Sequence, residues 1–221
     1  MKQIILLSFP RSGNTFTRYI LEQITHFESH GYDTKMDQVS VSDGNKNLDG
    51  KILKFHGHVP SDKEQILKKE QETKLVFLIR NPIECFIRHS KSNCYMPIVN
   101  DKSHSNVDYF FTNINIYKKF DGNKKIFYYE DMILNFRQYV NSLIEFVGDS
   151  KVSIDEFMAN EKQHKQNGLK FYNKFQRSYT AGKEMLFHSR NESEEMKELF
   201  WSNFKERVSL EESKIFERYY K

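Results

Sequence analysis

The sequence predicts an α/β fold in three layers, with a central and mainly parallel sheet between two layers of helices. Two observations lead to this prediction. Short apolar runs alternate along the chain with longer segments in which apolar residues recur at helical spacing. The two most strand-like runs, residues 4–7 and 74–79, are almost continuously apolar, which is typical of strands that are covered on both faces in a parallel sheet.

Four strands are expected, and each is followed by a polar turn. They cover residues 4–7, 51–55, 74–79 and 125–129. Helices are expected from about residue 14, over 61–72, 82–93, 107–120, in a segment that ends at Gly148, and over 192–205 and 209–220. Pro82 and Gly148 support two of these boundaries, because proline is common at the first position of a helix and glycine is common just after the last. Residues 28–50 and 161–190 show little periodicity, so we expect a long surface excursion and an irregular basic segment there.

The composition predicts a single domain over residues 1–221. The 34 basic and 30 acidic residues leave a net charge of +4, which is too mild to indicate a nucleic-acid partner but suits a small polyanion. Cys85 and Cys94 form neither a disulfide framework nor a zinc pattern, so we expect a reducing compartment and a cytoplasmic location. No apolar run is long enough for a signal peptide or a membrane span.

The first strand and the first helix are joined by a turn that is suited to an anion. The turn consists of Arg11, Ser12, Gly13, Asn14 and Thr15. Gly13 permits a sharp change of direction, and the first helical N–H groups then face the turn together with the positive end of the helix dipole. A guanidinium and hydroxyl groups add further donors. An ordinary polar turn between a strand and a helix is the alternative interpretation.

This turn is not a Walker A motif, because it has a single glycine and Asn14 occupies the position where a lysine would follow. An ATP- and Mg²⁺-dependent small-molecule or nucleotide kinase of related topology is therefore less favoured, but it stays an alternative. The other strands also end in polar residues, namely His56, Arg80 and the triplet Tyr129, Glu130 and Asp131. Because parallel strands share one carboxyl edge, we expect these residues to converge there.

The chain resembles the cytosolic-type sulfotransferases, which use 3′-phosphoadenosine 5′-phosphosulfate (PAPS) as the donor. Four short elements carry this resemblance, in the family's order. They are F-P-R-S-G-N-T at residues 9–15, K-F-H at 54–56, V-F-L-I-R-N at 76–81 and Y-Y-E-D-M at 128–132. The resemblance implies a P-loop-like fold and an enzyme that releases 3′,5′-bisphosphoadenosine (PAP) and requires no metal.

The resemblance assigns catalytic roles to three residues. His56 is expected to take the proton of the acceptor hydroxyl or amine, because an ordinary imidazole pKa of about 6.5 suits a base near neutral pH. His58 is the rival candidate, since alternate residues of an extended chain face the same side. Lys54 and Arg11 are expected to stabilise the developing negative charge, and Arg11 does so without donating a proton. For His56, a structural histidine at a strand end is the alternative.

The nucleotide contacts also follow from the resemblance. Residues 11–15 are expected to bind the 5′-phosphosulfate, and Arg80 the 3′-phosphate. Phe16 is expected to stack on the adenine in place of the family's commoner tryptophan, while Tyr129 borders the adenine.

Three further residues are expected near the nucleotide, each at a departure from the family pattern. Arg88 stands where the family usually has a serine that contacts the 3′-phosphate, and Ser90 follows two residues later, so either is a candidate. Lys183 is the counterpart of a late basic segment that closes over the nucleotide. Asp131 is expected to cap the helix that follows it.

The sequence does not define the acceptor. The segments expected to border it, residues 28–50, 95–106 and 161–190, are polar and partly basic, which favours a small-molecule or sugar-type polar acceptor over a steroid-like one. A small aromatic alcohol is the alternative, given Tyr95, Phe171, Tyr172 and Phe175. A non-catalytic nucleotide-binding protein is a second alternative, which the set Arg11, Lys54, His56 and Arg80 disfavours.

Overall fold

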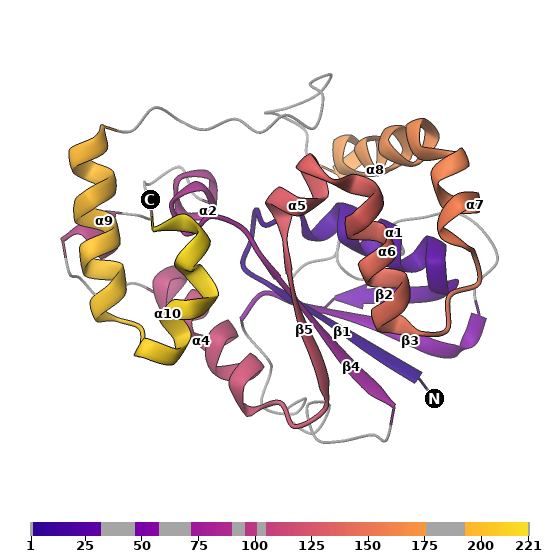
Figure 1. The fold of residues 1–221 in the computed structure, drawn as a ribbon, viewed down its shortest axis with the longest axis horizontal. Coiled ribbons are helices and arrows are strands. Elements are labelled where there is room, and N and C mark those ends of the chain that lie inside the picture. The colour runs from indigo at the N-terminus through magenta and orange to yellow at the C-terminus, as the bar shows by residue number, and fades with distance from the viewer. Residues whose placement is uncertain are drawn as a thin grey trace.

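The computed structural model describes residues 2–31, 47–57, 72–89, 96–100, 105–175 and 193–220. A five-stranded sheet of order β2-β3-β1-β4-β5 lies at its centre, and all neighbouring strands are parallel (Figure 1). The strands are β1 (Lys2–Ser8), β2 (Phe27–Gly31), β3 (Asn47–Phe55), β4 (Thr73–Ile79) and β5 (Asn123–Tyr128). The four predicted strands and their parallel direction are therefore confirmed.

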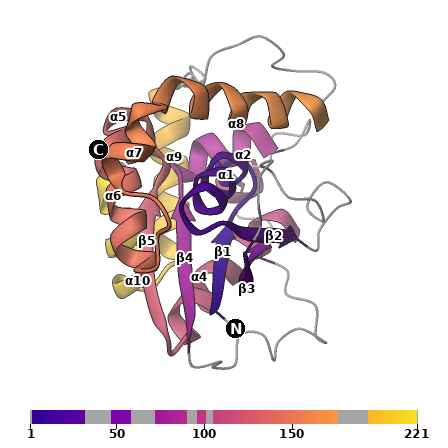
Figure 2. The same ribbon diagram turned by 90° about the vertical axis from the view of Figure 1, so that its right-hand side faces the viewer.

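Helices cover both faces of the sheet, as Figure 1 shows. One face carries α1 (Asn14–Thr25), α5 (Tyr129–Leu134), α6 (Phe136–Val147) and α7 (Ile154–Ala159). The other carries α2 (Pro82–His89), α3 (Met96–Val99), α4 (Ser105–Lys119), α9 (Glu194–Glu206) and α10 (Leu210–Phe216), which continues into the 3-10 helix η3 (Glu217–Tyr219). In Figure 2, α8 (Glu161–Phe175) runs across the top of α1, towards the carboxyl ends of the strands.

Alternate residues of each strand face the two helical layers, as the pleat of a β-strand requires. In β1, Ile5 and Leu7 pack with the layer that contains α2, α4 and α9, whereas Ile4 and Leu6 pack with α1 and α6. All four residues are at most 3% exposed. Burial on both faces explains why the central strands appear as almost continuous apolar runs in the sequence.

The predicted surface excursion over residues 28–50 is wrong at both ends, which form β2 and the first part of β3; residues 32–46 lie outside the described residues. An inward position of β2 is occupied by Ser29, which is fully buried. Its hydroxyl accepts hydrogen bonds from the Arg18 guanidinium at 2.9 and 3.1 Å and donates one to Glu22. Because a polar residue occupies an inward position, the sequence of β2 lacks the alternation of apolar and polar residues that would indicate a strand.

The prediction of an irregular segment over residues 161–190 is wrong in its first half, which forms α8. This helix has few apolar residues because a narrow strip of it contacts α1. Gly168 lies so close to the Phe16 ring that a Cβ atom there would be 2.4 Å from Cδ2, and Nδ1 of His164 lies 2.9 Å from the Tyr19 hydroxyl. The glycine that weakens the helical pattern is thus the residue that permits the close approach.

The helix expected up to Gly148 is divided at Asn135 into α5 and α6. Gly148 does end α6, with a left-handed φ of 73° and an N–H bond to the Ile144 carbonyl at 2.9 Å. The sequence analysis missed α7, although the capping box of Ser153 and Glu156 begins it. This S-x-x-E pattern is the local signal that identifies such a helix.

Several predictions fall on residues that the structure does not describe. They are the helix over 61–72 apart from Glu72, the end of the helix after His89, and His58, Ser90, Cys94, Tyr95 and Lys183. Within the described ranges, no helix has the length and apolar character needed to cross a membrane.

Candidate functional site

The parallel strands bring four of the predicted site residues to one edge of the sheet. Nδ1 of His56, after β3, lies 2.9 Å from the carbonyl oxygen of Ser8 at the end of β1. The Arg80 guanidinium, after β4, donates to the carbonyl of Arg11 at 3.1 Å. Cζ of the same arginine lies 4.2 Å from the centre of the Tyr129 ring, after β5. The convergence that the strand ends predicted is therefore present in the fold.

The turn between β1 and α1 has an unusual backbone, with a φ of 72° at Arg11 and 87° at Gly13. The left-handed region is unfavourable for a residue with a side chain, and the bond from Arg80 holds the Arg11 carbonyl in this conformation. A Cβ atom at Gly13 would lie 2.5 Å from Cδ2 of Tyr129. Both the backbone and the neighbouring ring therefore require glycine at this position.

The N-terminus of α1 is suited to an anion. Gly13 is its N-cap, and no side chain forms a capping hydrogen bond there. The first N–H groups of this 12-residue helix therefore face the turn, together with the positive end of the dipole. Arg11 is exposed and Thr15 is half-buried beside them, so this part of the turn can hold a phosphate- or sulfate-type group.

Two residues of the turn direct their side chains into the protein. The hydroxyl oxygen of Ser12 lies 3.3 Å from the Cys85 sulfur, and the Asn14 amide donates to the Ser8 hydroxyl at 2.8 Å. Burial raises the pKa of the Cys85 thiol to about 12, so this group stays neutral beneath the turn. The Ser12 N–H donates to the Phe9 carbonyl at 3.3 Å, so of these two residues Asn14 can offer an anion its backbone N–H group. Both side chains hold the turn in shape.

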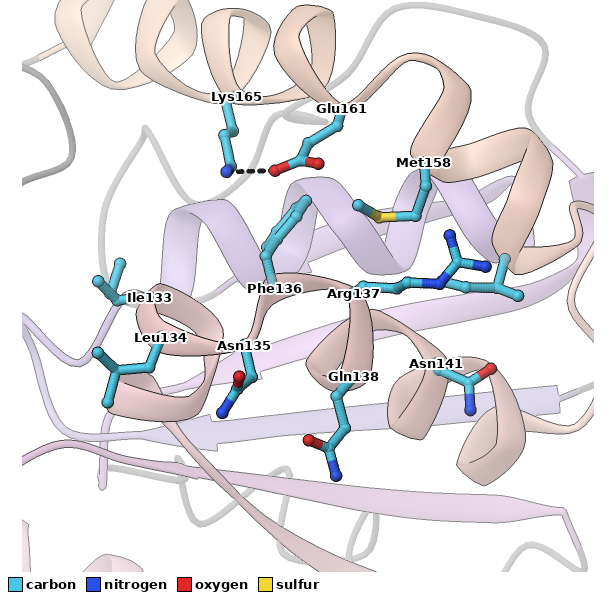
Figure 3. A pocket seen from close by; sticks show the side chains of 11 residues that line it. Ile133, Leu134, Asn135, Phe136, Arg137, Gln138, Asn141, Met158, Glu161 and Lys165 are labelled. Carbon is cyan, nitrogen blue, oxygen red and sulfur yellow. Dashed lines mark hydrogen bonds and ion pairs between the residues drawn. The ribbon is translucent and has the colours of Figure 1, made fainter.

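Phe16, the residue expected to stack on adenine, lies in the core and is 5% exposed. Its ring stacks on Phe136 of α6 at a centroid distance of 5.7 Å. Phe136 also lines a pocket of about 700 Å³ between α5–α6 and α7–α8. Figure 3 shows this pocket, with the Lys165–Glu161 ion pair above the Phe136 ring. None of the predicted site residues that the structure describes lines the pocket, and the adenine contact of Phe16 stays a prediction.

The contact between His56 and Ser8 determines which ring nitrogen can act as a base. A carbonyl oxygen only accepts hydrogen bonds, so the 2.9 Å contact requires that Nδ1 of His56 carries the hydrogen. In the neutral ring, Nε2 then holds the lone pair. The Ser8 hydroxyl lies 3.2 Å from the same Nδ1 and also receives the Asn14 amide. The histidine and the turn are therefore linked through one buried serine.

Lys54 lies two residues before His56, opposite Leu6 of β1 and Gly31 of β2, and is 2% exposed. It shares a face of β3 with Ile52, which packs in the layer of α1. Arg88 belongs to α2, the helix that begins at Pro82 as predicted. Among the described residues, no three His, Cys, Asp or Glu side chains gather as metal ligands would.

The sequence analysis missed the contacts of the β5 end with the last part of the chain. Asp131 lies in the first turn of α5, where a negative charge suits the helix dipole, but the predicted cap forms no hydrogen bond. Both oxygens of Asp131 instead accept from Arg218, at 2.7 and 3.1 Å. Glu130 accepts from the backbone N–H of Asn81 at 3.0 Å and from the Tyr219 hydroxyl at 2.6 Å. No local pattern indicates these pairs, since their partners are far apart in the sequence.

Comparison with known proteins agrees with this fold. Mouse sulfotransferase SULT7A1, solved in complex with PAP, has a TM-score of 0.57 at 13% identity, over 96% of this chain and 87% of that one. Retinol dehydratase, solved with androsterone and the inactive cofactor PAP, has a TM-score of 0.61 at 13% identity, over 95% of this chain and 82% of that one. No curated protein matches this chain. The sequence profile of the sulfotransferase domain matches residues 1–221, and the chain therefore belongs to the sulfotransferase domain family.

Proposed function

We propose that this protein is a PAPS-dependent sulfotransferase with a single domain over residues 1–221, which sulfates a hydroxyl or amine of a small acceptor. The observation that carries the proposal is the convergence of the Arg11 turn, Arg80 and His56 at one edge of the sheet. The presence of PAP in two proteins of the same fold supports this choice of nucleotide.

The residues at this edge fit a nucleotide with two anionic groups. The uncapped N-terminus of α1 and the exposed Arg11 suit the 5′-phosphosulfate. Arg80 suits the 3′-phosphate because its guanidinium is planar, always charged and held against the Tyr129 ring. The candidates for a second contact with the same phosphate are Arg88 of α2 and Ser90, which lies outside the described residues.

When bound, PAPS supplies the sulfuryl group, whose bond to the 5′-phosphate oxygen breaks as the acceptor atom bonds to sulfur, which leaves PAP. Nε2 of His56 takes the acceptor's proton, because the hydrogen on Nδ1 is held by the Ser8 carbonyl. Arg11, Lys54 and the first N–H groups of α1 stabilise the negative charge of the leaving oxygen.

For the acceptor we propose a polar small molecule, such as one with sugar-type hydroxyl groups. The segments that the sequence assigns to the acceptor side are rich in lysine and amide residues, and α8 has exposed lysine and glutamine side chains where it is described. Such a surface forms hydrogen bonds with hydroxyl groups more readily than it covers an apolar ring system.

Ligand-dependent stability tests the proposed nucleotide. PAP at a hundred times its dissociation constant should raise the free energy of unfolding by about 2.7 kcal/mol, and it should do so in the presence of EDTA. Thermal unfolding with PAP, with ATP–Mg²⁺ and without ligand measures this. Stabilisation by ATP–Mg²⁺ alone would contradict the proposal and favour the kinase alternative.

The variant Arg80→Gln tests the 3′-phosphate contact. The wild type should bind PAP more tightly than adenosine 5′-monophosphate, and the variant should lose about ten- to a hundredfold of this preference, as for a charged hydrogen-bonded pair. Isothermal titration calorimetry with both nucleotides gives the ratio of the two dissociation constants. A general loss of folded protein does not alter this ratio. Arg137→Gln is the matched control, since Arg137 is an exposed arginine of α6 that pairs with Asp155. Equal affinity of the wild type for both nucleotides would refute the assignment.

A further inference from the structure

We propose that Tyr219 and Glu130 form a clasp with the Asn81 backbone, and that this clasp positions Arg80 and Tyr129 for the nucleotide. The link to the nucleotide rests on the proposed function, whereas the positioning is a property of the free protein. Tyr219 and Glu130 are positioning residues in this proposal, because they act through their neighbours.

The geometry of the clasp joins two strand ends. Glu130 is 9% exposed, and each of its carboxylate oxygens accepts one hydrogen bond, from the Asn81 N–H at 3.0 Å and from the Tyr219 hydroxyl at 2.6 Å. Asn81 directly follows Arg80, and Glu130 directly follows Tyr129. One carboxylate therefore ties together the two peptides that carry the stacked guanidinium and ring. Through Arg80, the clasp also reaches the Arg11 carbonyl in the turn.

A carboxylate is an unfavourable group near an edge that binds anions, and a buried one requires hydrogen-bond donors. Tyr219 is a dependable donor, because burial and the adjacent Glu130 carboxylate raise its pKa well above the ordinary value. The hydroxyl therefore stays protonated across the physiological pH range. The donors that Glu130 faces come from two other segments, namely the Asn81 backbone after β4 and the Tyr219 side chain in η3. We therefore infer that Glu130 holds these two segments together.

The last part of the chain has further contacts with β5 and α5, which provide a matched control. Arg218 pairs with Asp131 and lies over the Tyr128 ring at 4.3 Å. The Tyr128 hydroxyl donates to the Ile215 carbonyl at 3.0 Å. None of these contacts involves Glu130. The Tyr219 hydroxyl, in contrast, bonds to Glu130, which in turn bonds to Asn81 after the end of β4. Tyr128→Phe thus removes a hydroxyl that holds the same segment but leaves the clasp intact.

We expect Tyr219→Phe to raise the dissociation constant for PAP by about three- to tenfold, the range of one lost hydrogen bond at a buried site. Turnover at saturating donor should stay close to the wild-type value. Tyr128→Phe should bind PAP like the wild type, even if the two variants lose similar thermal stability. Glu130→Gln, which keeps the shape and one acceptor, should fall between the wild type and Glu130→Ala.

Hydrogen exchange of the nucleotide-free protein tests the clasp independently of catalysis. Tyr219→Phe should speed exchange in peptides that cover residues 9–16 and 80–84, whereas Tyr128→Phe should leave them unchanged. If the wild type does not bind PAP, the proposed function fails while the exchange data still report on the clasp. Equal exchange and equal affinity in the two tyrosine variants would overturn the clasp and leave the proposed function standing.

Discussion

Replacing His56 with alanine should lower kcat by a factor of about 10²–10⁴, while the dissociation constant for PAP changes little. The variant lacks the nitrogen that takes the acceptor's proton, whereas the nucleotide contacts that we propose come from the Arg11 turn and Arg80. Initial rates at saturating donor, with calorimetric titration of PAP, separate the two effects.

The control for this experiment is His26→Asn, which changes an exposed histidine at the C-terminal end of α1, where asparagine tolerates the left-handed backbone. Its rates should match those of the wild type. ¹⁵N spectra of the neutral His56 ring should show the hydrogen on Nδ1, because the Ser8 carbonyl can only accept. An unchanged kcat in His56→Ala would move the role of base to another group, with His58 as the first candidate.

Arg11→Ala should lower kcat/KM by about 10²–10³ or more, as for the loss of a group that stabilises transition-state charge. Arg11 is the exposed cation beside the uncapped N-terminus of α1, where negative charge is expected to build on the leaving oxygen. Steady-state rates with PAPS as the varied substrate measure this loss. Arg11→Lys keeps the positive charge and should retain part of the activity.

The left-handed backbone of Arg11 requires a second variant, because alanine keeps the strain at a φ of 72°. Arg11→Gly relieves that strain, so it should be at least as stable as Arg11→Ala and equally inactive. If Arg11→Gly were as active as the wild type, the guanidinium would have no role in transfer, and the effect of alanine would be one of backbone conformation.

The features of this fold that are predictable from the sequence depend on residues that are close together in the chain. The strands over 4–7 and 74–79 were predictable because burial on both faces leaves a continuous apolar run. The turn at Gly13 and the convergence of His56 and Arg80 followed from turn chemistry and from the rule that parallel strands share an edge. The first kind of inference depends only on residues that are near one another in the sequence. The second depends only on a parallel sheet, which the alternation of strands and helices already implies.

The missed elements depend on partners that are distant in the sequence. Strand β2 places Ser29 inside, where Arg18 and Glu22 satisfy its hydroxyl. Helix α8 has Gly168 where the Phe16 ring leaves no room for a Cβ atom. Neither residue has the apolar character by which a pattern search finds buried positions.

The sequence alone determined the fold class, the family and the residues that meet at the carboxyl edge, because strand patterns and strand-end motifs are local. The tertiary structure decided how those residues are used. It turned the side chain of Asn14 towards Ser8, buried Phe16 under α8, and joined Glu130 to Tyr219. The direction of a side chain depends on which donors and surfaces the folded chain brings beside it, and local spacing carries no information about them.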